Sequence, residues 1–172
     1  MSSLIFYKYF HKNYNLSYLQ LSGMILINFI TFNLFELKDH LVLSLLLISS
    51  LTDIEKRIIP NFIPITITIL SIKSIKIELY TLDLLIILIF ALLILISIVK
   101  DSIGMGDVKL LFSIYLFKGI LFFNSMIIIL SFFMFLIAIF LLVKIQNYKE
   151  SFPLAPLIFL SFLLARSIIW KK

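Results

Sequence analysis

The sequence predicts an all-α integral membrane protein, a polytopic helical bundle with about seven hydrophobic segments. Two observations carry this prediction. The 172 residues are 62% apolar with a mean hydropathy of +1.17, whereas a soluble domain of this size needs a more polar surface. Seven apolar runs also follow one another along the chain, separated by short charged or polar loops.

The ionisable residues exclude several classes of site and partner. The net charge is +6, but Lys and Arg flank the apolar runs, where they meet lipid headgroups. We therefore expect a lipid bilayer as partner and no nucleic acid. The chain has no cysteine, which excludes disulfides, a thiol nucleophile and thiolate zinc sites. The two histidines, His11 and His40, lie far apart, so no metal site is predicted.

The N-terminal segment, residues 1–40, is predicted to add one transmembrane helix to the core. Its apolar run, 16–35, is long enough to span a bilayer. A signal peptide has a shorter apolar core and small residues at a cleavage site, so we expect this run to be retained. The polar residues 36–40 are expected to form a loop, with Asp39 in it.

The membrane core, residues 41–172, carries six further apolar runs. They are 41–51, a run that reaches residue 72 after Pro60 and Asn61, about 79–99, 104–117, 120–143 and 152–170. Several of these runs are shorter than a full bilayer crossing. We expect tilted helices around a thinned or water-filled site.

The distribution of basic residues does not orient the chain. With the N-terminus inside, eight basic residues fall inside and seven outside, which is too small a bias. The position of two acids relative to each other is better determined. Two crossings separate Asp53 from Asp107, so both are predicted at the same face of the membrane.

The stretch 104–110 stands out from the apolar sequence around it. Two of the chain's four glycines, Gly104 and Gly106, lie within three residues of Asp107. A carboxylate at the mouth of a membrane helix is costly, so it marks a candidate functional site. Glycine allows a close approach to the backbone, and we expect an extended substrate to lie there.

Asp53 supplies the second half of the hypothesis. It ends an apolar run and is followed by Pro60, which suits the first turn of a helix, and by Asn61, expected to satisfy free backbone groups there. Two acids within hydrogen-bond reach share one proton. The ionised acid takes a proton from water while the other donates to a peptide carbonyl, as in aspartic proteases. Asp53 and Asp107 are thus predicted to be a catalytic pair.

Three other polar or proline positions have two interpretations each. Lys109 lies near the acids or the substrate, or instead reaches the headgroups or pairs with Glu55 or Asp101. Pro153 and Pro156 expose backbone to a substrate strand, or only kink the last helix.

Residues 53–61, the stretch 104–110 and the segment Phe-Pro-Leu-Ala-Pro at 152–156 resemble the type IV prepilin peptidase family, which are GxGD-type membrane aspartic proteases. The resemblance covers roughly residues 41–170. It implies that Asp53 and Asp107 are catalytic and that the active site faces the cytoplasm at the inner membrane. It also implies prepilin or pseudopilin substrates, cut just before their hydrophobic helix.

The chain departs from larger family members in two ways. Those members carry a cysteine tetrad that binds zinc, and they methylate the new N-terminus. This chain has no cysteine, so we predict peptidase activity without methylation, zinc or S-adenosylmethionine. The helix after Asp107 is also bulkier than is usual in the family, at Leu111, Phe112 and Tyr115.

Other functions compete with this prediction. One is a GxGD protease for other membrane proteins, since Pro-Leu-Ala-Pro is similar to a proline-alanine-leucine element of such enzymes. Another is a proton-coupled transporter that uses the two acids as a relay, although the chain lacks the repeated halves of many transporters. A catalytically dead subunit is disfavoured by the two intact acids. Substrate identity and oligomeric state stay open.

Overall fold

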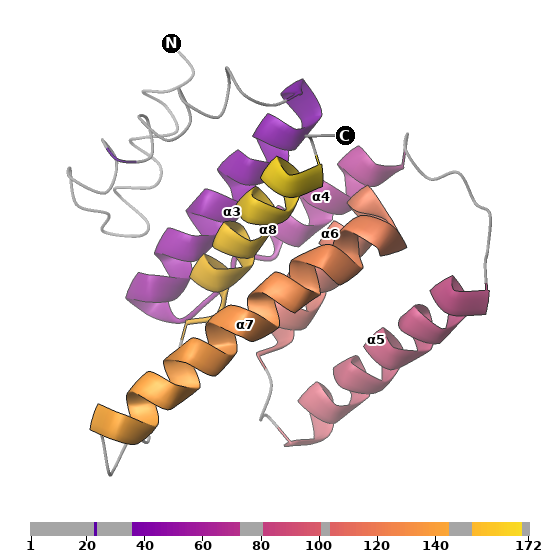
Figure 1. Cartoon of the computed structure of the whole chain (residues 1–172). Coiled ribbons are helices and arrows are strands. Elements are labelled where there is room, and N and C mark those ends of the chain that lie inside the picture. The colour runs from indigo at the N-terminus through magenta and orange to yellow at the C-terminus, as the bar shows by residue number, and fades with distance from the viewer. Residues whose placement is uncertain (1–22, 24–35, 73–80, 101–103, 145–152, 170–172) are drawn as a thin grey trace.

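The computed structural model describes residues 23, 36–72, 81–100, 104–144 and 153–169, and most of these residues lie in helices (Figure 1). The helices are α3 (Leu37–Lys56), α4 (Phe62–Ser71), α5 (Thr81–Lys100), α6 (Met105–Lys118), α7 (Ile120–Lys144) and α8 (Ala155–Ile169). No strand occurs within these ranges. The all-α prediction is therefore confirmed for the described residues.

The six helices correspond to the second to seventh apolar runs. The first run, 16–35, lies outside the described residues, so the count of seven segments stays a prediction. Among the described residues, one stretch, Ile120–Phe140, is helical, long and apolar enough to cross a membrane. The shorter apolar helical stretches are Phe62–Ser71, Leu84–Ser97 and Ala155–Ile168.

Helix α3 begins inside the polar patch for which a loop was predicted. Asp39 lies in its first turn and is only 1% exposed, so the prediction of a loop was wrong. The physical reason is charge compensation, since Asp39 forms ion pairs with Lys118 of α6 and Arg166 of α8. The predicted boundary between residues 40 and 41 falls within this helix.

Helices distant in sequence pack side by side. The C-terminal α8 lies between α3 and α7, and α4 packs against α6 (Figure 1). The fully buried side chains of this core are largely aliphatic and include Leu43, Leu46, Ile63, Ile67, Leu110, Ile114, Met126 and Ile158. By contrast, α5 and α7 expose large apolar side chains such as Leu88, Leu92 and Phe132. Helices that are apolar all round suit a lipid environment.

The bulky residues of α6 form its contacts with two neighbouring helices. The ring of Phe112 meets Phe90 of α5 edge-on at a centroid distance of 5.1 Å. The ring of Tyr115 meets Phe123 of α7 at 5.6 Å, also edge-on. Aromatic pairs of this geometry are favourable, so the bulk after Asp107 joins α6 to α5 and α7.

Candidate active site

Asp53 lies in the last turn of α3 and is only 7% exposed. The helix ends there because Arg57 adopts the left-handed conformation, with φ 56° and ψ 32°. The N–H of Arg57 donates to the main-chain carbonyl of Asp53 at 3.0 Å. The chain then turns into the linker that leads to α4. Asp53 thus lies at a well-defined helix end.

The carboxyl group of Asp53 is held by the beginning of α8. The main-chain N–H of Ala155 donates to Asp53 Oδ2 at 3.0 Å. The hydroxyl of Ser50, one turn before Asp53, donates to the Ala155 carbonyl at 3.2 Å. The first N–H groups of a helix lack partners within that helix. Asp53 therefore caps α8 from a different helix.

The two prolines flank this contact instead of kinking α8. Pro153 precedes the helix, and Pro156 lies in its first turn. Proline fits that turn, since its missing N–H would be unpaired there anyway. The N–H of Ala155, between the two prolines, is the backbone donor that reaches Asp53. In this structure the backbone beside the prolines is buried and binds a catalytic candidate of the same chain.

Asp107 lies in the first turn of α6 and is half-buried. Its main-chain N–H donates to the carbonyl of Gly104 at 3.0 Å. The side-chain atom Oδ1 is buried and has no hydrogen-bond partner among the described residues. The carboxyl groups of Asp107 and Asp53 interact electrostatically. The structure therefore brings the two acids together at one end of the bundle.

The two glycines before Asp107 face neighbours within the protein. A Cβ atom on Gly104 would lie 2.6 Å from Asp107 Oδ2, and one on Gly106 would lie 2.9 Å from the Cβ of Ile59. The first glycine leaves space for the carboxyl group itself. The second lets α6 pack tightly on the linker that follows Asp53. We expected a substrate backbone at these glycines, and in this structure their space is occupied by Asp107 and Ile59.

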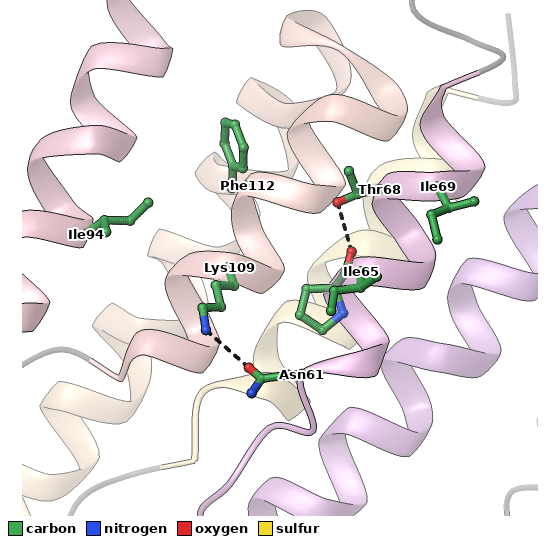
Figure 2. Close-up of a pocket in the computed structure, with 8 residues that line it drawn as sticks. Asn61, Ile65, Thr68, Ile69, Ile94, Lys109 and Phe112 are labelled. Carbon is green, nitrogen blue, oxygen red and sulfur yellow. Dashed lines mark hydrogen bonds between the residues drawn. The ribbon is translucent and has the colours of Figure 1, made fainter.

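Lys109 points to α4, as Figure 2 shows. Its Nζ donates to Asn61 Oδ1 at 3.2 Å. Residues two apart on a helix do not face the same side, so Lys109 and Asp107 project from α6 in different directions. Glu55 and Asp101 were the predicted partners of Lys109. The observed partner is Asn61, and Asp101 lies outside the described residues.

Asn61 does not have the capping role that the sequence suggested. It stands at the N-cap of α4 but makes no side-chain capping hydrogen bond. Its side-chain oxygen accepts from Lys109 instead. Pro60 lies two residues before α4, not in its first turn as the sequence predicted. Its carbonyl accepts the N–H of Ile63 at 3.1 Å.

An apolar groove of about 490 Å³ extends from Asn61 and Lys109 along α4 and α6 (Figure 2). Its lining comes from α4, α5 and α6 and comprises Asn61, Pro64, Ile65, Thr68, Ile69, Ile94, Lys109 and Phe112. Among the described residues that line the groove, Lys109 alone is charged. The groove is therefore suited to an apolar chain.

Sequence reasoning missed two groups that the structure connects to the acids. One is the N–H of Ala155, which has no side-chain signature. The other is Asp39, whose ion pairs lie at the far end of the same helices. A spacing could have indicated Asp39: it precedes Asp53 by 14 residues, close to four helical turns, so both lie on the same side of α3.

Comparisons with known proteins bear on the identity of the chain. Searches of curated proteins and of solved structures found no match. A family model for the type IV leader peptidase family matches residues 40–165, which include Asp53, Asp107, both glycines and both prolines. On this match, the chain belongs to the type IV leader peptidase family.

Proposed function

We propose that this peptidase is a membrane aspartic endopeptidase that removes the leader from type IV prepilin-like or pseudopilin substrates. One observation carries the proposal. The buried carboxyl group of Asp53, held by the N–H of Ala155, interacts electrostatically with the carboxyl group of Asp107. We assign the enzyme to the cytoplasmic (inner) membrane, with its active site open to the cytoplasmic face.

The proposed chemistry needs only the two carboxyl groups and water. Two close carboxyl groups do not both ionise readily, so the pair holds one proton. The ionised member accepts a proton from water, which attacks the scissile carbonyl carbon, while the protonated member donates to the carbonyl oxygen. The resulting intermediate expels the amine, which takes up a proton, and the C–N bond breaks. The hydrogen bond from Ala155 keeps one oxygen of Asp53 fixed throughout.

The remaining candidates support this pair or receive the substrate. Gly104 and Gly106 leave room for Asp107 and for the packing of α6 on Ile59. Pro153 and Pro156 shape the start of α8 that holds Asp53. We propose that the groove beside Lys109 and Asn61 receives an apolar part of the substrate.

Cleavage itself is the test of the function. The purified protein in detergent or lipid is mixed with a prepilin-like substrate, and the products are identified by mass spectrometry. We expect one cut, between the leader and the hydrophobic helix. A protein that leaves prepilin-like substrates intact but cleaves other membrane proteins would contradict the substrate class. Proton-coupled uptake without proteolysis would contradict the enzyme class.

Filling the groove is expected to weaken substrate binding without stopping the chemistry. Thr68 lines the groove, and Thr68→Trp should raise KM roughly tenfold with kcat nearly unchanged, since about 1.4 kcal/mol of binding would be lost. Thr66→Trp is the matched control, because Thr66 is on the same helix but does not line the groove. Equal KM values for the two variants would argue against substrate in this groove.

The new N-terminus is expected to carry no methyl group. The chain has no cysteine with which to build the zinc tetrad of larger family members, and the proposed chemistry uses carboxyl groups alone. Cleavage is therefore expected to proceed equally well with EDTA present. Mass spectrometry of the mature product, after incubation with S-adenosylmethionine, checks the prediction. A mass increase of one methyl group, or inhibition by EDTA, would contradict it.

A further inference from the structure

A second polar group is buried at the other end of the helices that carry the active site. Asp39 of α3, 1% exposed, forms ion pairs with Lys118 of α6 and with Arg166 of α8. The distance from Arg166 Nε to Asp39 Oδ2 is 2.5 Å. We call Asp39, Lys118 and Arg166 the distal ion cluster. Glu36, which is exposed, approaches Arg166 at 3.8 Å.

Stability alone is a weak reason for this arrangement. Removing charges from water is costly, and well-packed apolar residues often stabilise as much as a buried ion pair. Ion pairs differ from apolar contacts in direction, because they fix which sides of the helices meet. The distal ion cluster is therefore suited to fixing the rotation and the longitudinal position of three helices.

The same three helices meet again at the active site. Helix α3 carries Asp39 and Asp53, 14 residues apart, or about 21 Å along the axis. Helix α6 carries Asp107 and Lys118, and α8 carries Ala155 and Arg166.

In both α6 and α8, the residue near the active site and the residue of the distal ion cluster are 11 positions apart, about 16 Å along the axis. A spacing of 11 or 14 residues is close to three or four whole turns, so Asp39 and Asp53 lie on one side of α3, and Asp107 and Lys118 on one side of α6. In α8, the main-chain N–H of Ala155 makes the contact at one end and the side chain of Arg166 makes it at the other.

We infer that Asp39 is a positioning residue for the reaction. Through Lys118 it sets the rotation of α6, which aims Asp107, and through Arg166 it sets the position of α8, which places the Ala155 N–H at Asp53. The role assigned to the reaction rests on the proposed function, whereas the effect on helix geometry does not. A misplacement of about 1 Å at reacting groups can cost a large factor in rate, so contacts some 20 Å away matter.

The kinetic test compares Asp39→Asn with Asp39→Glu and with Met126→Ala. Met126 is a fully buried residue of α7 outside the distal ion cluster, so its variant controls for loss of stability. For Asp39→Asn we expect kcat to fall by about tenfold or more with KM unchanged. Asp39→Glu should restore much of the loss. If Asp39→Asn fails to fold, Lys118→Met, which removes a partly exposed partner, is measured in its place.

A second measurement does not depend on activity. The chain has no cysteine, so Asp53→Cys and Asp107→Cys can be introduced together and bridged with thiol crosslinkers of graded length. Adding Asp39→Asn or Lys118→Met is expected to lower the yield with the shortest reagent, and Met126→Ala is expected to leave it unchanged.

The outcomes separate this inference from the proposed function. Unchanged crosslinking would overturn the inference, as would a kcat for the Asp39 variant equal to that of an equally destabilised Met126→Ala. If the wild type cleaves no prepilin-like substrate, the proposed function fails, and crosslinking still decides the geometric role of Asp39. If Asp53→Asn keeps full activity, the proposed catalytic pair is refuted, and crosslinking again decides the geometric role of Asp39.

Discussion

Replacing either Asp53 or Asp107 with asparagine is expected to slow leader cleavage by roughly 10³-fold while the protein stays folded. An amide cannot exchange the proton that the pair passes between water and the peptide. The fold should tolerate both changes. In Asp53→Asn the amide oxygen can still accept from the Ala155 N–H, which now lies 3.0 Å from Oδ2 of Asp53. Asp107 Oδ1 has no hydrogen-bond partner to lose among the described residues.

Initial rates of cleavage measure this effect, and Glu55→Gln is the matched control. Glu55 is an exposed acid two residues after Asp53 in the same helix, so its variant should cleave at the wild-type rate. The double variant of Asp53 and Asp107 should be no slower than either single one, since residues that act as a unit are not additive. A single variant with normal kcat would refute the dyad.

Gly106→Ala is expected to lower both stability and activity. Its Cβ would lie 2.9 Å from the Cβ of Ile59, and neither atom belongs to a flexible side-chain end. Overpacking of this kind costs about 1–3 kcal/mol, and it would push α6 away from the linker after Asp53. We expect a lower melting temperature and a kcat reduced by about 10²-fold, because Asp107 moves with α6.

The partner of this contact provides the control. In an Ile59→Gly background the clashing atom is absent, so adding Gly106→Ala should cost little there. In an Ile59→Ala background the Cβ remains, and the cost should persist, as a double-mutant cycle would measure. Gly104→Ala provides a contrast to Gly106→Ala. The backbone of Gly104, with φ −59° and ψ 112°, suits alanine, and only the side-chain carboxyl group of Asp107 must turn to make room. Wild-type stability and activity of Gly106→Ala would contradict the packing role.

The helices were predictable because their apolar runs are long and the intervening polar residues are few. The prediction failed where a charge is buried, at the start of α3. Nothing local to Asp39 distinguishes it from a loop residue. Its burial depends on Lys118 and Arg166, which are far along the chain and come close only when α3, α6 and α8 pack together.

The two acids of the candidate site were predictable from the sequence, but their surroundings were not. Counting crossings predicted Asp53 and Asp107 at one face, and in the structure their carboxyl groups interact; their catalytic role stays a prediction. The surroundings were harder to predict from sequence. Glycine indicates a close approach without naming the neighbour, and in both cases the neighbour belongs to the protein. The Ala155 N–H is a backbone group, and its importance depends on where α8 begins.

The cap that Asp53 provides for α8 has a consequence for biogenesis. The donor, Ala155, is synthesised 102 residues after its acceptor. While the ribosome is still making the chain, both aspartates can reach the membrane before the helix that holds one of them exists. The nascent protein therefore carries the acids before it carries a complete site. The hydrogen bond that holds the Asp53 carboxyl group can form only after the first turn of α8 has been synthesised.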